Sequence, residues 1–279
     1  MGNRRKRGDF LDGADGLLSD PLSIAVAARD REVLTMVRDA LARRRFMLAF
    51  QPVVIAGAPD RIAFHEGLIR VLDEGGRIIP AADFMAVAET SELGRLLDCA
   101  ALDMGLQELA AQPDLRLSIN MSARSIGYPR WTRILEDGLR DATVGERLIL
   151  EVSEASAMLM PDIVSVFMAD LHRRGISFAL DDFGAGFTML RHLRDFCFDM
   201  VKIDGQFIRA ISTTPDNQAL TRAMVAIGRN FDMLVVAESV ESQADAAWLA
   251  RAGVDCLQGY FFGAPTVRPA WHNGSRRSA

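Results

Sequence analysis

The stretch SFALDDFGAGF, residues 177–187, decides how the rest of the sequence is interpreted. It begins with an apolar run that is typical of a buried strand, and the run ends in two adjacent carboxylates, Asp181 and Asp182. Neighbouring negative charges repel, so each carboxylate makes the other harder to ionise. A sequence that keeps both at the end of an apolar strand therefore predicts positive charge beside them.

The same pattern, a short apolar run followed by a helical stretch, recurs along the chain. Besides SFALDDFG, the runs are FMLAFQPVV, RIAFHEGLI, LRLSINMS, RLILEVSE, DMVKIDG, MLVVAESVE and DCLQGYF. Helical patterns between them cover residues 100–111, 163–174, 217–230 and 244–252. Alternating units of this kind predict a parallel α/β fold, and eight strands favour a closed (β/α)8 barrel of the TIM type. An open doubly wound sheet is the alternative, although the sequence has neither GxGxxG after a strand nor GxxxxGK[ST].

We expect four segments along the chain. Residues 1–22 are polar and rich in Gly and Asp, which predicts a mobile leader. Residues 23–45 carry apolar side chains at helical spacing, which predicts an amphipathic helical segment. The barrel then covers residues 46–269, and residues 270–279 form a C-terminal tail.

Composition argues against several classes of protein. The formal net charge is −5 and the basic residues are scattered, so we expect no nucleic-acid partner. No window approaches about 18 uninterrupted apolar residues, and the basic start lacks the apolar stretch of a signal peptide, so we expect no membrane span. Cys99, Cys197 and Cys256 lie far apart without CxxC spacing, which is typical of free thiols in a reducing cytosol. We therefore predict a cytoplasmic protein.

Polar side chains follow the apolar runs at the point where each strand should end. They are Glu66, Asn120, Glu151, Asp181, Asp182, Lys202, Glu238 and Gln258. In a parallel barrel the carboxyl ends of the strands converge on one mouth, so residues far apart in the sequence would form one site. Five carboxylates at one mouth need positive charge, and Mg²⁺ or Mn²⁺ prefers the oxygen ligands of Asp, Glu and Asn. The adjacent aspartates could serve two ions, as two-metal phosphoester chemistry requires.

Two other classes share parts of this pattern. The DFG at residues 182–184 also occurs in protein kinases, but no Gly-rich loop, VAIK lysine or HRD loop accompanies it. A barrel enzyme of enolase type would use carboxylate-held Mg²⁺ and a lysine base, but the strand ends offer no second lysine and no histidine. We set the kinase aside and keep the enolase type as a minor alternative.

With these motifs in hand, the sequence resembles the EAL-domain family, which comprises bacterial phosphodiesterases of the second messenger cyclic di-GMP. The resemblance extends from about residue 46 to residue 265. It is carried, in the family's order, by FQPVV, EGLIR, SINMS, LEVSE, ALDDFGAGF, VKID, AESVE and LQGYFFGAP. It implies a modified TIM barrel with one antiparallel strand near its start. The implied reaction is hydrolysis of cyclic di-GMP to linear 5′-pGpG by metal-activated water attacking in line.

The resemblance also implies roles for individual residues. The residues that would bind two Mg²⁺ or Mn²⁺ ions are Glu66, Asn120, Glu151, Asp181, Asp182 and Glu238. Those that would serve catalysis directly are Lys202, Glu238, Gln258 and Glu66, with Lys202 orienting the attacking water and Gln258 positioning the water or the metal shell. Gln51, Arg70 and Glu241 would contact the substrate. Glu154 would steady the loop at residues 183–190, which in the family links the metal site to a dimer interface.

The motifs depart from the family at three places. Gly67 replaces the alanine of EAL, Ser239 replaces the glycine of AEGVE, and DDFGAGFTM replaces the usual DDFGTGYSS. We expect Gly67 to add backbone freedom next to Glu66, and Ser239 to be strained if its φ is positive. The loop changes should affect the second metal and dimer-linked activation more than catalysis.

Two functions follow from the resemblance. The first is an active phosphodiesterase, expected as a homodimer. The second is a cyclic di-GMP receptor with weak or no turnover that acts through a protein partner. The intact strand-end carboxylates and Lys202 favour the first.

Overall fold

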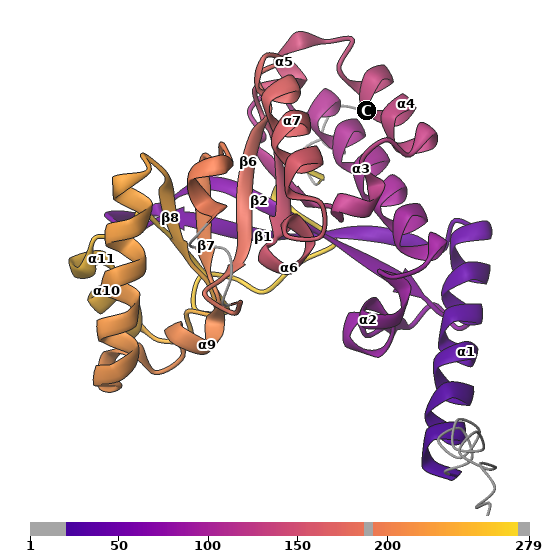
Figure 1. Ribbon diagram of the computed structural model, residues 1–279, viewed down its shortest axis with the longest axis horizontal. Helices are drawn as coiled ribbons and strands as arrows, with labels where there is room; N and C mark the ends of the chain where they lie inside the picture. The colour runs from indigo at the N-terminus through magenta and orange to yellow at the C-terminus, as the bar shows by residue number, and fades with distance from the viewer. Residues whose placement is uncertain (1–20, 187–191, 273–279) are drawn as a thin grey trace, which may run out of the picture.

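Eight strands close into a barrel in the computed structural model, which describes residues 21–186 and 192–272 (Figure 1). The barrel strands are β1 (Phe46–Ile55), β2 (Ala58–Leu72), β4 (Leu117–Asn120), β5 (Leu148–Ser153), β6 (Ser177–Phe183), β7 (Met200–Ile203), β8 (Leu234–Ala237) and β9 (Cys256–Gln258). Their order is β1-β9-β8-β7-β6-β5-β4-β2, and β2 pairs with β1 to complete the ring, while the short β3 (Ile78–Ile79) lies outside it on β2. The predicted closed barrel is confirmed, and the open sheet is wrong.

Strand β1 is antiparallel to both of its neighbours, whereas the remaining pairs of the ring are parallel. The reason is local, because β1 and β2 are joined by a tight turn that pairs Ile55 with Ala58. A connection that short can only join antiparallel strands. The antiparallel strand expected near the start of the barrel is therefore confirmed.

Helices cover the outside of the barrel (Figure 1). They are α1 (Pro21–Ala42), α2 (Met85–Ala88), α3 (Glu92–Ala111), α4 (Pro129–Gly138), α5 (Ala142–Gly145), α6 (Glu154–Ala157), α7 (Pro161–His172), α9 (Gly205–Ile208), α10 (Pro215–Asn230) and α11 (Gln243–Ala252). Each of the four helical patterns in the sequence falls on one of the longer helices, α3, α7, α10 and α11. None of the helices in the described ranges is long and apolar enough to cross a membrane.

The N-terminal helix α1 ends earlier than the predicted residue 45. Its last residue is Ala42, and Arg44 then adopts a left-handed conformation with φ 54°. This turn brings the N–H of Arg45 to the carbonyl of Ala40 at 2.8 Å, which is how helices commonly terminate. The side chains of Val33, Val37 and Ala40 pack on β2, β3, α2 and α3. The predicted leader, apart from the first residues of α1, lies outside the described residues.

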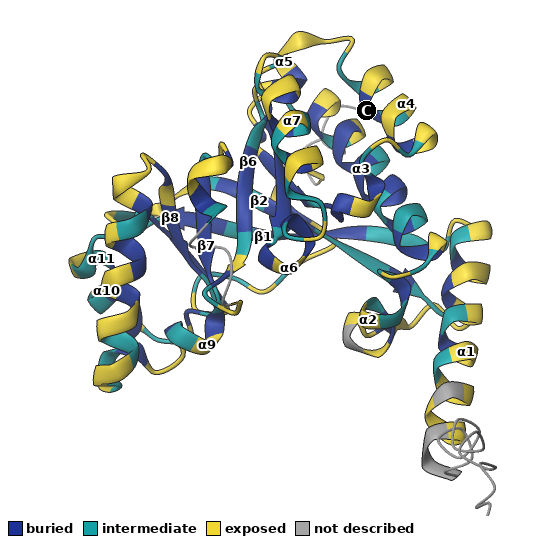
Figure 2. Ribbon diagram, in the orientation of Figure 1, coloured by how far each residue is buried: buried dark blue, intermediate teal, exposed yellow. Residues whose placement is uncertain are grey.

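The core has two layers on either side of the barrel wall. A large cluster lies between strands and helices and includes Leu109, Trp131 and Phe178. A smaller cluster fills the barrel interior and consists of Val53, Phe64, Ile149, Ala179, Met200, Val236 and Cys256. Figure 2 shows the strands largely buried and the exposed residues on the outer faces of helices such as α4 and α10. The interior is thus filled, and any site must lie at its rim.

The sequence predicted a C-terminal tail from residue 270, but the first residues of this segment pack against the barrel. The ring of Trp271 lies 5.2 Å from Phe50 and 4.8 Å from His65, and its Nε1 donates to Glu108 at 3.1 Å. Those contacts cover the outer face of β1 and β2. The apolar Trp271 is the feature that makes this segment part of the fold. Residues 273–279 are outside the described ranges.

Trp271→Ala should lower the free energy of unfolding by about 2–4 kcal/mol, because it removes a large side chain packed on the rings of Phe50 and His65 together with one hydrogen bond to Glu108. Denaturant unfolding followed by circular dichroism measures this. Val166→Ala is the control, since Val166 is 72% exposed and should change stability by less than about 0.5 kcal/mol. Equal effects for the two variants would show that Trp271 does not hold the segment.

Candidate active site at the barrel mouth

The polar strand-end residues form one layer inside the barrel. Each of seven strands carries an apolar interior residue and, two positions away on the same face, a polar one. Examples are Ile149 with Glu151 on β5 and Met200 with Lys202 on β7. Side chains two apart in a strand lie on the same side, so the polar layer lies directly above the apolar one. Its members are Gln51, Glu66, Asn120, Glu151, Asp181, Lys202, Glu238 and Gln258, with Asn120 above Ser118 on the remaining strand.

Lys202 lies at the centre of this layer and is fully buried. Its Nζ is 2.7 Å from a carboxylate oxygen of Glu151, 2.7 Å from Glu238, 3.2 Å from Glu66 and 3.3 Å from Asp181. This ammonium supplies positive charge beside Asp181, one of the two adjacent aspartates. Burial would lower the pKa of Lys202, but the four carboxylates outweigh it and hold the pKa well above its usual value. Lys202 therefore stays charged at neutral pH.

One lysine does not neutralise the carboxylates around it. Burial and the nearby Glu66 raise the pKa of Glu151 well above its usual value. Burial, with repulsion from Asp181, raises the pKa of Glu238 to about 8 and that of Asp182 to about 6. Glu66 differs, because although burial opposes ionisation, the charge of Lys202 and hydrogen bonds from two amides lower its pKa. The described site thus has fewer positive charges than its carboxylates require.

The two amides flank Glu66. Asn120 Nδ2 donates to Glu66 Oε1 at 2.8 Å, and Gln258 Nε2 donates to Glu66 Oε2 at 2.6 Å. Gln258 Nε2 also lies 3.2 Å from Gln51 Oε1, and Gln51 is opposite Glu66 in the β1–β2 register. These contacts fix the carboxylate of Glu66 in one orientation.

Asp182 reaches the mouth because β6 is irregular. Consecutive strand residues normally point to opposite faces, which would send Asp182 away from Asp181. Here the register with β7 shifts between Leu180 and Phe183, and Asp182 adopts φ 56°. As a result, oxygens of Asp181, Asp182 and Glu238 all lie within 4.8 Å of one another. A left-handed conformation in a non-glycine residue is strained, and such strain is typical of functional sites.

The donor set fits a hard divalent cation. Two buried oxygens, Glu151 Oε1 and Gln258 Oε1, have no hydrogen-bond partner within the described part of the chain, and Asp181 Oδ1 has only its ion pair with Lys202 at 3.3 Å. Buried polar atoms without partners are costly, and carboxylate and amide oxygens are the ligands that Mg²⁺ and Mn²⁺ favour. The cluster of Asp181, Asp182 and Glu238 offers three such oxygens together.

A pocket of about 250 Å³ opens beside this layer. Its lining residues are Gln51, Glu66, Leu68, Arg209, Glu238, Ser239, Glu241, Gln258, Gly259 and Tyr260. Gln51 and Glu241, predicted to contact substrate, line it. Arg70 does not; its guanidinium donates to the carbonyl of Ile69 at 3.1 Å, and burial lowers its pKa against the opposing effect of Glu66. Arg209 was not predicted from the sequence, because no motif marks where the helix before it ends.

Glu154 lies beside the loop that follows β6. It is buried at the start of α6, and its Oε2 accepts from the N–H groups of Gly184 and Gly186, both at 3.3 Å. These bonds tie the backbone after the paired aspartates to β5. Residues 187–190 of the predicted loop, with three of its four departures from DDFGTGYSS, are outside the described ranges.

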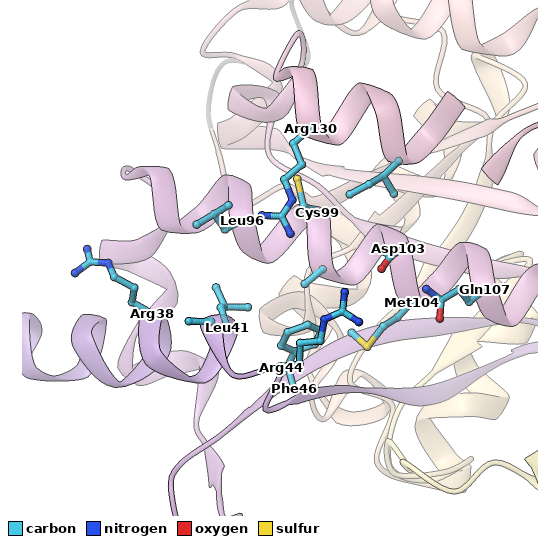
Figure 3. A pocket seen from close by; sticks show the side chains of 13 residues that line it. Arg38, Leu41, Arg44, Phe46, Leu96, Cys99, Asp103, Met104, Gln107 and Arg130 are labelled. Carbon is cyan, nitrogen blue, oxygen red and sulfur yellow. The ribbon is translucent and has the colours of Figure 1, made fainter. Parts of the chain in front are cut away.

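A second cavity, of about 290 Å³, lies away from the strand ends (Figure 3). It is formed by α1, α3 and α4, and Figure 3 shows Arg38, Cys99 and Arg130 around it. None of the polar strand-end residues lines it. The chemistry that the sequence predicts is therefore concentrated at the barrel mouth.

The space beside Gly67, where a Cβ would lie, is filled by a neighbouring side chain. It pairs with Ile119 in the β2–β4 register, and a Cβ at position 67 would lie 2.7 Å from Ile119 Cδ1. Ile119 is buried and also packs against Gly105, where a Cβ would meet Cδ1 at 2.8 Å. The expectation of added freedom beside Glu66 therefore does not match the packing, because Ile119 occupies the position of the missing methyl.

Ser239 meets the condition for strain. Its φ is 55°, a conformation that glycine adopts without cost and other residues adopt at about 1–2 kcal/mol. The side chain points over Gly205, where an added Cβ would lie 2.7 Å from Ser239 Cβ. The serine hydroxyl thus lies at the rim of the pocket.

The fold and site define a TIM-type barrel with one antiparallel strand and a lysine-centred carboxylate cluster at its mouth. The EAL domain model matches residues 34–265, and the chain belongs to this family.

Relatives with described roles are similar over most of this chain. The bifunctional diguanylate cyclase/cyclic di-GMP phosphodiesterase MucR of Pseudomonas aeruginosa is 32% identical over 86% of the chain, and the signaling protein YkoW of Bacillus subtilis is 31% identical over 82%. The matched regions make up only 36% and 29% of these relatives. The chain thus corresponds to about a third of each.

Solved structures share the fold. The phosphodiesterase of MucR in complex with cyclic di-GMP has a TM-score of 0.73 and 30% identity, covering 87% of this chain and 99% of that one. The EAL domain of FimX from Pseudomonas aeruginosa, bound to cyclic di-GMP, has a TM-score of 0.76 and 25% identity, covering 85% and 97%.

Gly67→Ala should lower the free energy of unfolding by about 1–3 kcal/mol, because the new methyl overpacks against Ile119. Ile119→Val removes Cδ1 and should cost about 0.5–1.5 kcal/mol alone. In the double variant the two changes compensate, so the loss should be smaller than their sum. A double-mutant cycle from denaturant unfolding measures the coupling, and strict additivity would show that Ile119 does not occupy this space.

Ser239→Gly should raise the free energy of unfolding by about 0.5–1 kcal/mol, because it relieves the left-handed strain, partly offset by the greater freedom of glycine when unfolded. Ser239→Ala is the matched control, since it removes the hydroxyl and keeps the strained backbone. Thermal unfolding of both variants separates the two effects. No gain for glycine over alanine would rule out strain at this position.

Proposed function

We propose that this chain hydrolyses cyclic di-GMP to linear 5′-pGpG with two Mg²⁺ or Mn²⁺ ions. The observation that carries the proposal is the polar layer itself, in which four carboxylates surround Lys202 and further oxygens remain unpaired. Membership of the EAL family gives that layer its context, and several relatives are named cyclic di-GMP phosphodiesterases, among them PdeF of Escherichia coli.

The residues that would hold the ions come from five strands. They are Glu66, Asn120, Glu151, Asp181, Asp182 and Glu238. Proximity favours Asp181, Asp182 and Glu238 as one group of ligands, since their oxygens already lie together. Ions bound there would supply activation of water and charge neutralisation at the phosphate oxygens.

Lys202 and Gln258 would orient the attacking water. Lys202 remains protonated, so it would act as a fixed positive charge beneath the reacting group. Gln258 has both of its donor contacts on one nitrogen, which leaves Oε1 free to accept from a water molecule. Both side chains are buried among fixed partners, so their orientation needs no rearrangement during the reaction.

The same lysine argues against proton abstraction of the enolase type. A general base must be neutral near the working pH, and four surrounding carboxylates raise the pKa of Lys202 instead. The homodimer and the regulatory protein partner expected from the sequence remain predictions.

Purified protein incubated with cyclic di-GMP should yield 5′-pGpG only when Mg²⁺ or Mn²⁺ is present, and EDTA should abolish the product. Glu238→Gln should reduce kcat by on the order of 100-fold or more, because a metal site contributes several kcal/mol to the reaction. Glu136→Gln, an exposed surface change on α4, is the control and should keep the original rate. Chromatography of the nucleotides measures the metal dependence and the rates of the two variants.

The outcomes separate the candidate functions. Substrate that stays intact while calorimetry detects binding would replace the enzyme with the receptor that acts through a partner. Neither turnover nor binding would contradict the proposed function altogether. Unchanged kcat in Glu238→Gln would exclude this carboxylate from the metal site.

A further inference from the structure

The pocket beside the polar layer is acidic except at one position. Glu66, Glu238 and Glu241 line it, and Arg209 is the single basic residue among the described residues of the lining. Lys202 does not line the pocket, and its Nζ is ion-paired with four carboxylates. An anionic ligand entering this pocket would therefore meet repulsion from three carboxylates and attraction from one guanidinium.

Arg209 is placed by the element that follows Lys202. Strand β7 ends at Ile203, Asp204 caps the short helix α9, and Arg209 is the first residue after it, with its N–H bonded to the carbonyl of Gly205 at 3.0 Å. A Cβ at position 205 would lie 3.8 Å from Arg209 Nη2. The guanidinium of Arg209 thus lies near Gly205, against which Ser239, the neighbour of Glu238, packs closely.

The guanidinium is exposed and has no partner. Within the described ranges, Arg209 makes neither a side-chain hydrogen bond nor an ion pair, even though Glu238 and Glu241 line the same pocket. Arginine presents five donors in a planar fork that matches the oxygens of a phosphate. An unpaired fork at the rim of this acidic pocket is suited to bind an anionic group of the substrate.

We propose that Arg209 binds the phosphate of cyclic di-GMP that is not cleaved, an inference that rests on the proposed function. The molecule carries two phosphates in one ring. If one lies above Asp181, Asp182 and Glu238, where cations would neutralise it, the other stays in the same pocket and needs its own positive charge. Arg209 supplies it from the wall next to Glu238, and it is a substrate-positioning residue rather than a catalytic one.

The test compares wild type with Arg209→Ala, Arg209→Lys and the control Arg251→Ala. Arg251 is exposed near the end of α11, which leads to the amino end of β9, so its removal changes net charge equally but at the opposite end of the barrel. Arg209→Ala should raise KM by about 10- to 100-fold with kcat within threefold, since it removes charge-assisted hydrogen bonds to a non-reacting group. Arg209→Lys should restore part of the loss, and Arg251→Ala should match wild type.

The dependence of KM on salt distinguishes two groups that Arg209 could contact, the charged phosphate and the neutral edge of a guanine base. A contact to a charged phosphate is screened by salt, so the KM of wild type should rise with NaCl more steeply than that of Arg209→Ala. Equal salt dependence would assign Arg209 to a neutral group and overturn the inference, as would a KM unchanged in Arg209→Ala. If wild type binds without turnover, calorimetric Kd values for the same variants replace KM. Wild type that neither binds nor hydrolyses cyclic di-GMP would instead refute the proposed function.

Discussion

The ion pairs of Lys202 are the constraint on which the site depends. A single ammonium, fully buried, holds carboxylates from four different strands within 3.3 Å of its nitrogen. The four carboxylates raise the pKa of Lys202 despite its burial, so it is not released by deprotonation near neutral pH. One ammonium cannot neutralise four carboxylates, so the layer lacks positive charge. Removal of the lysine or of a carboxylate would leave a buried charge without its partner. The barrel therefore positions a set of carboxylates whose neutralisation is completed by what binds there.

Backbone irregularities around this layer bring neighbouring residues to places that a regular strand would not allow. The bulge in β6 turns Asp182 to the same mouth as Asp181. At Gly67 the close approach of Ile119 replaces a methyl group and keeps β2 and β4 packed beside Glu66. Here the departure from the family's motif changes the packing partner and leaves the polar layer complete.

The sequence predicted the strands and the polar layer because both depend on local pattern. Apolar runs that end in a polar residue mark the strand and its end together, and barrel closure brings these ends to one place. Arg209 could not be predicted, because its place depends on where a four-residue helix ends. The packing of Trp271 was also missed, since a single aromatic after the last strand carries no periodicity. Interactions between distant segments, rather than local propensity, decided both.

The oxygens of Asp181, Asp182 and Glu238 are positioned to bind divalent cations. The most direct measurement is the anomalous scattering of Mn²⁺ in crystals of the protein grown with this ion and cyclic di-GMP. We expect two peaks at the barrel mouth, at least one of them within coordination distance of these three side chains. A crystal with nucleotide in the pocket and no manganese beside these carboxylates would contradict it.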